Sequence, residues 1–405
     1  MHFVRSLPLF VALALVSGCG DASRDPVRTP APTPTTPTAS EPTAPTPTVT
    51  LYPGVTAALT VNLAALPNYA TPAWPVHYDA PVRAQTNAPA DNPVTDAGAT
   101  LGRVLFHDRT LSINRNVSCA HCHQQSNGLT DTARFSAGFN TVDRTTSHSM
   151  RLANARFSAP AMFWDRRAAT LELQTTQPIQ DAVEMGFDAA HGGMSALISR
   201  MNGLRYYPEL FRFVFGDTVI TEARIQRAIA QYVRGAVSTD SRFDRAFAAA
   251  YNPAMGDRGV NVAFASFTPD ENRGKTLFLT PPNQGGGGCV ACHVVPTFAL
   301  AGAARSNGLD AGETRVFKSP SLKNVAVTGP FMHDGRFATL EQVVEHYVGG
   351  VQLGPALDNR LRLPTGQPVR LGLSASDKAA LVAFMRTLTD SALMTDARFS
   401  SPFRP

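Results

Sequence analysis

Two short clusters of cysteine and histidine recur in the chain with the same spacing. They consist of Cys119, Cys122 and His123, and of Cys289, Cys292 and His293. In a Cys-x-x-Cys-His motif the two thiols add to the vinyl groups of a haem, and the adjacent histidine becomes the proximal ligand of its iron. A zinc site that includes His121 is the alternative, but neither cluster has a second cysteine pair within range. The motifs therefore predict two covalently bound haems c.

The fifth cysteine, Cys19, follows a segment that is typical of an export signal. Residues 1–18 carry a positive charge at Arg5 and then a short apolar stretch. The sequence Val-Ser-Gly-Cys at 16–19 resembles a lipobox, in which Cys19 is lipidated after cleavage. A cleaved soluble form is the alternative. We expect a protein that faces the periplasm on a lipid anchor, in the outer rather than the inner membrane because Gly20 follows the cysteine.

Composition bounds the class of protein. The 405 residues are 43% hydrophobic and 17% charged, which is enough to build two domains of ordinary size. The net charge is +5, but the basic residues are scattered and show no nucleic-acid groove. The charge indicates a solvated surface or docking of an acidic partner, and we expect no nucleic-acid partner.

Each haem motif is preceded by a similar helical segment. Residues 102–106 read GRVLF and residues 274–278 read GKTLF, so the chain contains two related units. The second segment begins with Thr268, followed by Pro269 and Glu271, which form a capping box. This pattern predicts a helix over about 269–279.

Helical periodicity dominates elsewhere, at 222–237, 340–348 and 379–388, and alternating strand patterns are nearly absent. The prediction is a mostly α protein with two cytochrome c-like domains and long irregular loops. Residues 24–50 are rich in Pro and Thr and favour an extended tether. The predicted division is 1–18 signal peptide, 19–75 tether and extension, 76–265 first haem domain, 266–395 second haem domain and 396–405 tail.

Three segments resemble the superfamily of bacterial di-haem cytochrome c peroxidases and MauG. They are LGRVLFHDRTLS, FWDRRAATLELQTTQPIQDAVEMG and FKSPSLKNVAVTGPFMHDGRFATLEQVVEHY, within about residues 95–390. The resemblance implies that the haem on His123 reacts with hydrogen peroxide and that the haem on His293 relays electrons. Cleavage of the O–O bond needs an open iron position and a distal acid or base.

The resemblance also implies roles for four side chains near the first haem. Glu184 matches the distal glutamate, whose pKa burial would raise toward working pH, and Gln174 and Pro178 match distal-pocket residues. Trp164 matches the tryptophan between the haems that assists electron transfer. The alternatives are a surface acid for Glu184 and a core aromatic for Trp164. Arg166 stands where the family has glycine, and a turn that needs positive φ would resist it.

The second haem needs a further ligand opposite His293. Ordinary peroxidases of the family use a methionine from the helix after the HDG segment, and here the aligned residue is Tyr347. A His/Tyr pair resembles MauG, where a hard phenolate oxygen stabilises high-valent iron. The alternatives are that His346 or Met332 ligates the iron instead.

The resemblance further implies one calcium ion between the domains, bound by the carbonyls of Thr328 and Pro330 and by an asparagine. His148 stands at the asparagine position, and imidazole is a poor calcium ligand. It could instead face the first haem. His333 matches a family residue near the second haem, with a packed core histidine as the alternative.

Three functions follow. The first is a peroxidase that reduces hydrogen peroxide to water with electrons from a small periplasmic donor, a cytochrome c or a cupredoxin. The second is a MauG-like enzyme that uses high-valent di-haem iron to oxidise Trp or Tyr side chains of a partner protein, which Tyr347 and Gln174 favour. The third is a non-catalytic electron carrier, in which Glu184 would have no use.

Overall fold

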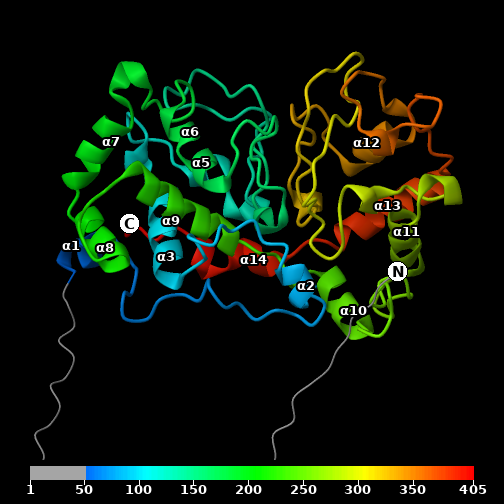
Figure 1. Cartoon of the computed structure of the whole chain (residues 1–405), viewed down its shortest axis with the longest axis horizontal. Coiled ribbons are helices and arrows are strands. Elements are labelled where there is room, and N and C mark those ends of the chain that lie inside the picture. The colour runs from blue at the N-terminus through cyan, green and yellow to red at the C-terminus, as the bar shows by residue number, and fades with distance from the viewer. Residues whose placement is uncertain (1–51) are drawn as a thin grey trace, which may run out of the picture. The chain divides into compact units, whose positions relative to one another are not determined.

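Helices joined by long loops make up residues 52–405, the part of the chain that the computed structural model describes. The predicted signal peptide, Cys19 and the Pro/Thr-rich tether lie outside the described residues. The α-helices (Figure 1) are α1 (Pro53–Ala58), α2 (Ala80–Arg83), α3 (Asp96–His107), α4 (Cys119–Cys122), α5 (Leu171–Thr175), α6 (Gln177–Gln180), α7 (Gly193–Asn202), α8 (Tyr206–Phe215), α9 (Glu222–Gly235), α10 (Arg242–Ala250), α11 (Pro269–Leu279), α12 (Leu340–Glu345), α13 (Ala375–Arg386) and α14 (Ser391–Thr395).

Short 3₁₀ turns and one π turn complete the helical structure. They are η1 (Arg109–Leu111), η2 (Gln125–Asn127), η3 (Ala155–Phe157), η4 (Ala189–His191), η5 (Pro282–Gln284), η6 (Cys289–Ala291), η7 (Val325–Val327), η9 (Asn359–Leu361), η10 (Ala397–Phe399) and the π turn η8 (His346–Gly350). Within residues 52–405, β-structure is limited to isolated bridges. The mostly α prediction is therefore confirmed. No helix in this range has both the length and the apolar character needed to cross a membrane.

Capping residues and helical periodicity in the sequence predict where several helices begin. Helix α11 begins at Pro269 and ends at Leu279, and the capping box of Thr268 and Glu271 is present with both of its hydrogen bonds. Helix α9 begins at Glu222, as its periodicity predicts, after Thr221 has capped it. The helix predicted over 340–348 is an α-helix only to Glu345 and then widens into the π turn η8.

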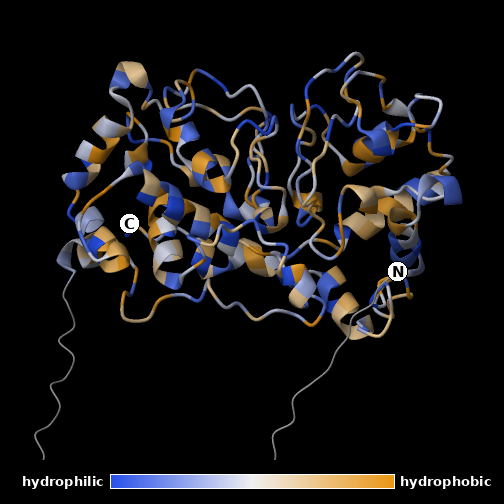
Figure 2. Ribbon diagram, viewed as in Figure 1, coloured by the Kyte–Doolittle hydropathy of each residue, from blue (hydrophilic) through white to orange (hydrophobic). Residues whose placement is uncertain are grey.

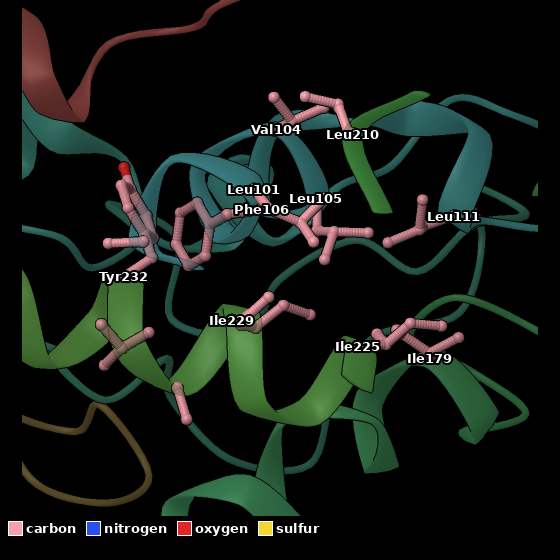
Figure 3. Close-up of a cluster of buried hydrophobic side chains, with 14 of the residues drawn as sticks. Leu101, Val104, Leu105, Phe106, Leu111, Ile179, Leu210, Ile225, Ile229 and Tyr232 are labelled. Carbon is pink, nitrogen blue, oxygen red and sulfur yellow. The ribbon is translucent and has the colours of Figure 1, made fainter. Parts of the chain in front are cut away.

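The first core forms where α3 packs against α9. Figure 3 shows Leu101, Leu105 and Phe106 of α3 facing Ile225 and Ile229 of α9. These side chains are at most 2% exposed, and burial of each stabilises the fold by roughly 1.5–3 kcal/mol. Figure 2 shows hydrophobic and hydrophilic residues side by side on α9, as expected for a helix with one buried face.

The second core forms around the pair α11 and α13, and it includes Phe278, Phe298 and Phe384. Helix α10 adds Phe243 and Phe247 to this core, although its residues precede the predicted domain boundary at 265. The C-terminal segment returns to the first core, where Phe399 is buried. The domain boundaries themselves stay a prediction.

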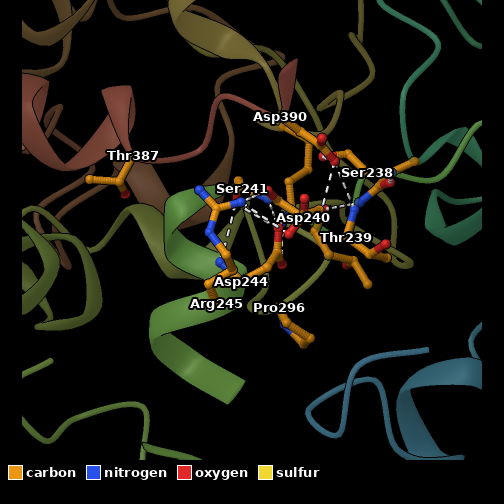
Figure 4. A network of polar contacts seen from close by, with 12 residues as sticks. Ser238, Thr239, Asp240, Ser241, Asp244, Arg245, Pro296, Thr387 and Asp390 are labelled. Carbon is orange, nitrogen blue, oxygen red and sulfur yellow. Dashed lines mark hydrogen bonds and ion pairs between the residues drawn. The ribbon is translucent and has the colours of Figure 1, made fainter. Parts of the chain in front are cut away.

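A buried polar network holds the segment that leads from α9 to α10 (Figure 4). The carboxylate of Asp390 accepts hydrogen bonds from the hydroxyl of Ser238 and from the backbone N–H groups of Thr239 and Asp240. Asp244 forms a capping box with the N-cap residue Ser241 of α10 and a fully buried ion pair with Lys323, at 2.6 Å. Loss of one partner from such a pair leaves an uncompensated buried charge, so this network fixes the path of the segment.

Two hairpins of similar conformation meet between the cores. In one, Met162 bridges Ala168, and in the other Phe331 bridges Phe337. The residues after Met162 and Phe331 both have positive φ, 66° for Phe163 and 74° for Met332. Trp164 and His333 are therefore equivalent positions of an internal repeat.

The two hairpins exchange equivalent backbone hydrogen bonds across the junction. The N–H of Lys318 donates to the carbonyl of Trp164 at 2.7 Å, and the N–H of His148 donates to the carbonyl of His333 at 2.8 Å. Each hairpin is thus held by a strand-like segment of the other half. This reciprocity fixes the two halves of the repeat against each other.

Close helix contact in each core requires a glycine, which gives a test of the repeat. A Cβ at Gly102 would overlap the carbonyl oxygen of Ala228 in α9, and a Cβ at Gly274 would overlap that of Ala380 in α13. We expect Gly102→Ala to lower the free energy of unfolding by at least about 2 kcal/mol, since backbone atoms must move apart. Chemical denaturation followed by circular dichroism measures this change. Gly256→Ala, where the added Cβ meets nothing within 4 Å, is the control, and equal stabilities of the two variants would contradict the packing.

Candidate active site

The first Cys-x-x-Cys-His motif lies on the short helix α4 and the residue after it. Nδ1 of His123 lies 3.2 Å from the carbonyl oxygen of Leu129 and 3.2 Å from the hydroxyl of Ser149. Ser149 in turn donates to the carbonyl of Cys122 at 2.6 Å. These contacts fix the ring and leave Nε2 as the nitrogen for an iron.

The second motif repeats this arrangement. Nδ1 of His293 lies 3.4 Å from the hydroxyl of Ser319, which donates to the carbonyl of Cys292 at 3.0 Å. Ser149 and Ser319 each stand 26 residues after their histidine. The same residue type at the same spacing orients both proximal ligands.

The protonation states in both motifs fit covalent haem attachment. Burial raises the pKa of Cys119 and of Cys289 to about 12, so both are neutral thiols, the form that adds to a vinyl group. Burial lowers the pKa of His123 and of His293 to about 4, so both imidazoles are neutral and able to bind iron. Within residues 52–405 no cluster of three or more His, Cys, Asp or Glu side chains is arranged to bind a metal ion directly. The residues fit haem c, while zinc would require thiolates.

Glu184 lies in a pocket of about 310 Å³ beside the first motif. The pocket is lined by Arg167, Gln177, Pro178, Gln180, Asp181 and Glu184. Burial raises the pKa of Glu184 to about 7; Asp181 acts in the same direction and Arg167 opposes it. The carboxylate is also close enough to raise the pKa of the Cys119 and Cys122 thiols, although burial is the larger cause there. A carboxyl group of this pKa can both accept and return a proton near neutral pH.

The other predicted distal residues are placed unequally. Pro178 lines the same pocket as Glu184, whereas Gln174 lies one turn earlier in α5 and is not among the lining residues. Gln177 and Gln180 supply the amide groups there instead. The spacing alone could not distinguish three glutamines in neighbouring turns.

Trp164 lies at the junction of the two hairpins. Its indole N–H donates to the carbonyl of His148 at 2.7 Å, and its ring meets that of His333 edge to face at 6.5 Å. Arg166, in the same loop, has φ of 63°, as does its repeat equivalent Gly335 at 64°. The turn does need positive φ, and Arg166 adopts it at a cost of roughly 1–3 kcal/mol. Its guanidinium donates to the carbonyl of Ala304 in the other half at 3.2 Å, which offsets part of the strain.

Tyr347 lies in the π turn η8 beside the second motif. Burial raises its pKa to about 12, a side-chain hydrogen bond from Asn307 lowers it, and both Cys292 and Cys289 are near enough to raise it. Asn307 donates to the Tyr347 hydroxyl and to the sulfur of Met332, each at 3.4 Å. Nε2 of His346 is 3.1 Å from the carbonyl of Asn307 and so is already occupied. The phenol of Tyr347 thus lies within electrostatic range of the haem-attachment thiols.

The internal repeat relates Tyr347 to Pro178. Thr170 caps α5 and Thr339 caps α12 in the two halves, and Pro178 and Tyr347 follow these caps at the same distance in sequence. Proline has no side-chain atom that can bind iron, whereas the phenol oxygen can. At this repeat position the second half therefore has a side chain that could bind iron, and the first half has none.

The residues predicted for calcium do not fit that ion. His148 is 4% exposed, and its Nδ1 and Nε2 lie 3.1 Å from the carbonyl of Ala133 and 3.4 Å from the hydroxyl of Thr130. The ring is thus engaged within its own half and offers no hard oxygen. His333 is buried and stacks on Phe317 at 4.0 Å, as in the alternative of a packed core histidine.

Several residues near the haem motifs carry no signal in the sequence taken alone. Asn307 lies in a loop and Arg360 in the 3₁₀ turn η9, outside any recognisable motif, yet Arg360 donates to the sulfur of Cys292 at 3.2 Å. Ser149 and Ser319 could have been identified only by aligning the two repeats, since a single serine in a sequence does not indicate contact with a haem ligand.

Comparisons with known proteins agree with this geometry. The family model described as di-haem cytochrome c peroxidase matches residues 96–252. The methylamine utilization protein MauG of Methylophilus methylotrophus is 31% identical over 76% of this chain and 88% of its own length. Cytochrome c551 peroxidase of Nitrosomonas europaea is 31% identical over 76% of this chain and 83% of its own. A crystal structure of a MauG-like protein associated with microbial copper homeostasis has a TM-score of 0.62 and 29% identity, and the match covers 83% of this chain and 98% of that one.

The raised pKa of Glu184 predicts a pH dependence. A base must be deprotonated, and this carboxyl becomes protonated as the pH decreases through about 7. We expect the rate constant for the reaction of the diferric protein with hydrogen peroxide, measured by stopped-flow absorbance, to fall below pH 7 and to level off above it. In Glu184→Gln the rate should be roughly 10²-fold lower and the inflection absent.

Asp91→Asn is the matched control, because it also replaces a carboxylate by an amide in the first half but at a side chain that is 70% exposed. It should keep both the rate and the inflection. An unchanged rate and pH profile in Glu184→Gln would remove Glu184 from the reaction.

Proposed function

Because this chain belongs to the superfamily of di-haem cytochrome c peroxidases and MauG, we propose that it is a MauG-type enzyme. It reacts with hydrogen peroxide at the haem on His123 and uses the oxidising equivalents to modify a Trp or Tyr side chain of a partner protein. That it is an oxidoreductase with peroxide or MauG-like chemistry follows from the family. The choice within the family rests on Tyr347.

The environment of Tyr347 supports its assignment as the second axial ligand. It is partly buried, lies near Cys289 and Cys292, and receives a hydrogen bond from Asn307. A phenolate is a hard, anionic ligand that stabilises oxidised iron, whereas a methionine thioether favours reduced iron. A site with this ligand favours the retention of oxidising equivalents over the acceptance of electrons from a weak reductant.

The protein supplies proton transfer at the first site. When bound, haem provides the iron that splits the O–O bond and takes up the oxidising equivalents. Glu184 accepts a proton from one peroxide oxygen and returns it to the other, so that the second leaves as water. Arg167 lines the pocket and limits the rise in the pKa of Glu184, which keeps part of the carboxylate available at neutral pH.

Trp164 and the junction supply the connection between the two sites. The indole N–H of Trp164 donates a hydrogen bond to the backbone carbonyl of His148 in the first half. The backbone carbonyl of Trp164 accepts one from the N–H of Lys318 in the second half. A large ring held in one orientation can carry an electron or a hole with little reorganisation. We assign Trp164 to transfer between the sites.

A cytochrome c peroxidase that receives electrons from a small donor is the second candidate. The 31% identity to a cytochrome c551 peroxidase favours it. Both candidates share cofactors and the first step with peroxide, and they differ in the source of electrons. A non-catalytic electron carrier would leave the raised pKa of the Glu184 carboxyl group in its pocket unexplained.

We also propose that the protein is exported and anchored by lipid at Cys19. The support is the sequence of residues 1–19 and the Pro/Thr-rich stretch that follows. An anchored enzyme with a tether can reach partners in the periplasm.

The variant Tyr347→Met tests the proposed function. We expect the wild-type diferric protein to react with one equivalent of hydrogen peroxide without prior reduction and to lack a methionine-to-iron charge-transfer band. Tyr347→Met should gain that band, show a higher potential at the second haem and turn over faster with reduced cytochrome c. Optical spectroscopy, redox titration and a steady-state assay measure these quantities.

Tyr251→Met is the matched control, because Tyr251 belongs to the periphery of the second core rather than to the haem site. It should leave all three properties as in the wild type. A methionine band in the wild type, or a wild type that reacts with peroxide only after reduction, would favour the peroxidase instead.

The lipid anchor predicts that Cys19→Ala changes where the protein is found. Wild-type protein should sediment with membranes and be released by detergent, whereas Cys19→Ala should lose the lipid and appear in the soluble or unprocessed fraction. Ser40→Ala, also within the N-terminal region, is the control. Membrane association and mass that are equal in Cys19→Ala and the wild type would contradict the anchor.

A further inference from the structure

The junction between the two hairpins contains two equivalent pairs of backbone carbonyls. Ala161 and Pro330 immediately precede the bridge residues Met162 and Phe331. Ala159 lies two residues before Ala161, and Thr328 lies two residues before Pro330. Thr328 and Pro330 are the carbonyls predicted to bind calcium, so the pair Ala159 and Ala161 shows what the same position holds in the other half.

A lysine ammonium occupies the pair in the first half. Nζ of Lys318 donates to the carbonyl of Ala159 at 2.6 Å and to that of Ala161 at 2.8 Å. Lys318 is only 7% exposed. A side-chain cation thus fills a carbonyl pair of this type and links the two halves without a metal ion.

Beside the side chain of Thr328 in the second half lies an arginine. Nη1 of Arg151 donates to the hydroxyl of Thr328 at 3.3 Å, and its Nε is buried without a hydrogen-bond partner. Asn154 and Asn324 both have a left-handed backbone conformation before a 3₁₀ turn, so they are equivalent positions of the repeat. Three residues before each of them stand Arg151 and Ser321, which are therefore also equivalent. The hydroxyl of Ser321 donates a hydrogen bond to the carbonyl of Thr297. A charged side chain at this repeat position is therefore found in the first half and not in the second.

Arg151 keeps its positive charge although its surroundings oppose it. Burial lowers its pKa to about 10, so it stays protonated at neutral pH. Its charge lowers the pKa of His293, after burial as the larger cause, which shows that it lies within electrostatic range of the second haem site. It acts on His148 in the same way.

We propose that side-chain cations replace calcium at this junction: Lys318 holds the carbonyls of Ala159 and Ala161, and Arg151 supplies the positive charge beside Thr328. His148 cannot supply the missing oxygen ligand, because an imidazole has no oxygen atom. Both of its ring nitrogens also face groups of its own half. A divalent ion next to a buried guanidinium would in addition meet a like charge in a medium of low dielectric constant. The protein therefore does not bind calcium at Thr328 and Pro330.

Metal analysis of the full holoprotein tests the absence of calcium. After purification in buffer with calcium, followed by desalting, elemental mass spectrometry should find well under one calcium per two haems. Thermal stability and the haem spectrum should be the same in the presence of EGTA and of calcium. One tightly bound calcium per chain, with a spectral change when EGTA removes it, would overturn the inference.

Variants of Arg151 test the built-in cation. Arg151→Ser, which installs the residue of the repeat equivalent, should lower the reduction potential of the second haem. Removal of a nearby positive charge favours the more positive, oxidised iron, which gives the sign of that shift. Arg151→Lys should keep the potential near that of the wild type. Equal potentials in the wild type, Arg151→Ser and Arg151→Lys would overturn the role of Arg151.

Discussion

The reciprocal backbone hydrogen bonds between the two hairpins are the constraint on which the rest of the molecule depends. The N–H of Lys318 holds the carbonyl of Trp164, and the N–H of His148 holds the carbonyl of His333. Because each of these residues follows the haem motif of its own half, these bonds fix the two motif-bearing halves relative to each other. Electron transfer depends steeply on such geometry. A junction made of backbone groups can keep it constant while side chains change.

The two halves share a backbone plan and differ in a few side chains that decide the chemistry. At one repeat position the first half has Pro178 and the second has Tyr347, so only the second offers an iron ligand. The first half adds Glu184, whose pKa burial raises to about 7. Burial raises the pKa of Tyr347 to about 12, so its phenol loses a proton only to a strong Lewis acid such as iron. Desolvation thus raises both pKa values, in the directions that the proposed roles of Glu184 as proton carrier and Tyr347 as iron ligand require.

Much of the chemistry could be predicted from the sequence because its signals are local. The Cys-x-x-Cys-His motifs and the capping box at Thr268 each act within a few residues, and α11 has the predicted bounds. Contacts between distant segments left no such signal. The hydrogen bond from Asn307 to Tyr347 joins residues 40 apart, and that from Arg360 to Cys292 joins residues 68 apart. Gln174 shows the same limit, since three glutamines fall in adjacent turns and only packing decides which of them line the pocket.

A junction built on side-chain cations has consequences for the oxidised enzyme. A chelator cannot remove Lys318 or Arg151, so the geometry between the sites would not vary with the calcium concentration around the protein. The cost is that the fold must bury both charges, which the carbonyls of Ala159 and Ala161 offset for Lys318. An arginine also brings a single positive charge where calcium would bring two. Oxidising equivalents add positive charge at the haem sites, and repulsion between like charges scales with their product. The smaller charge of Arg151 therefore favours retention of those equivalents at the second site, in the same direction as the proposed ligation by Tyr347.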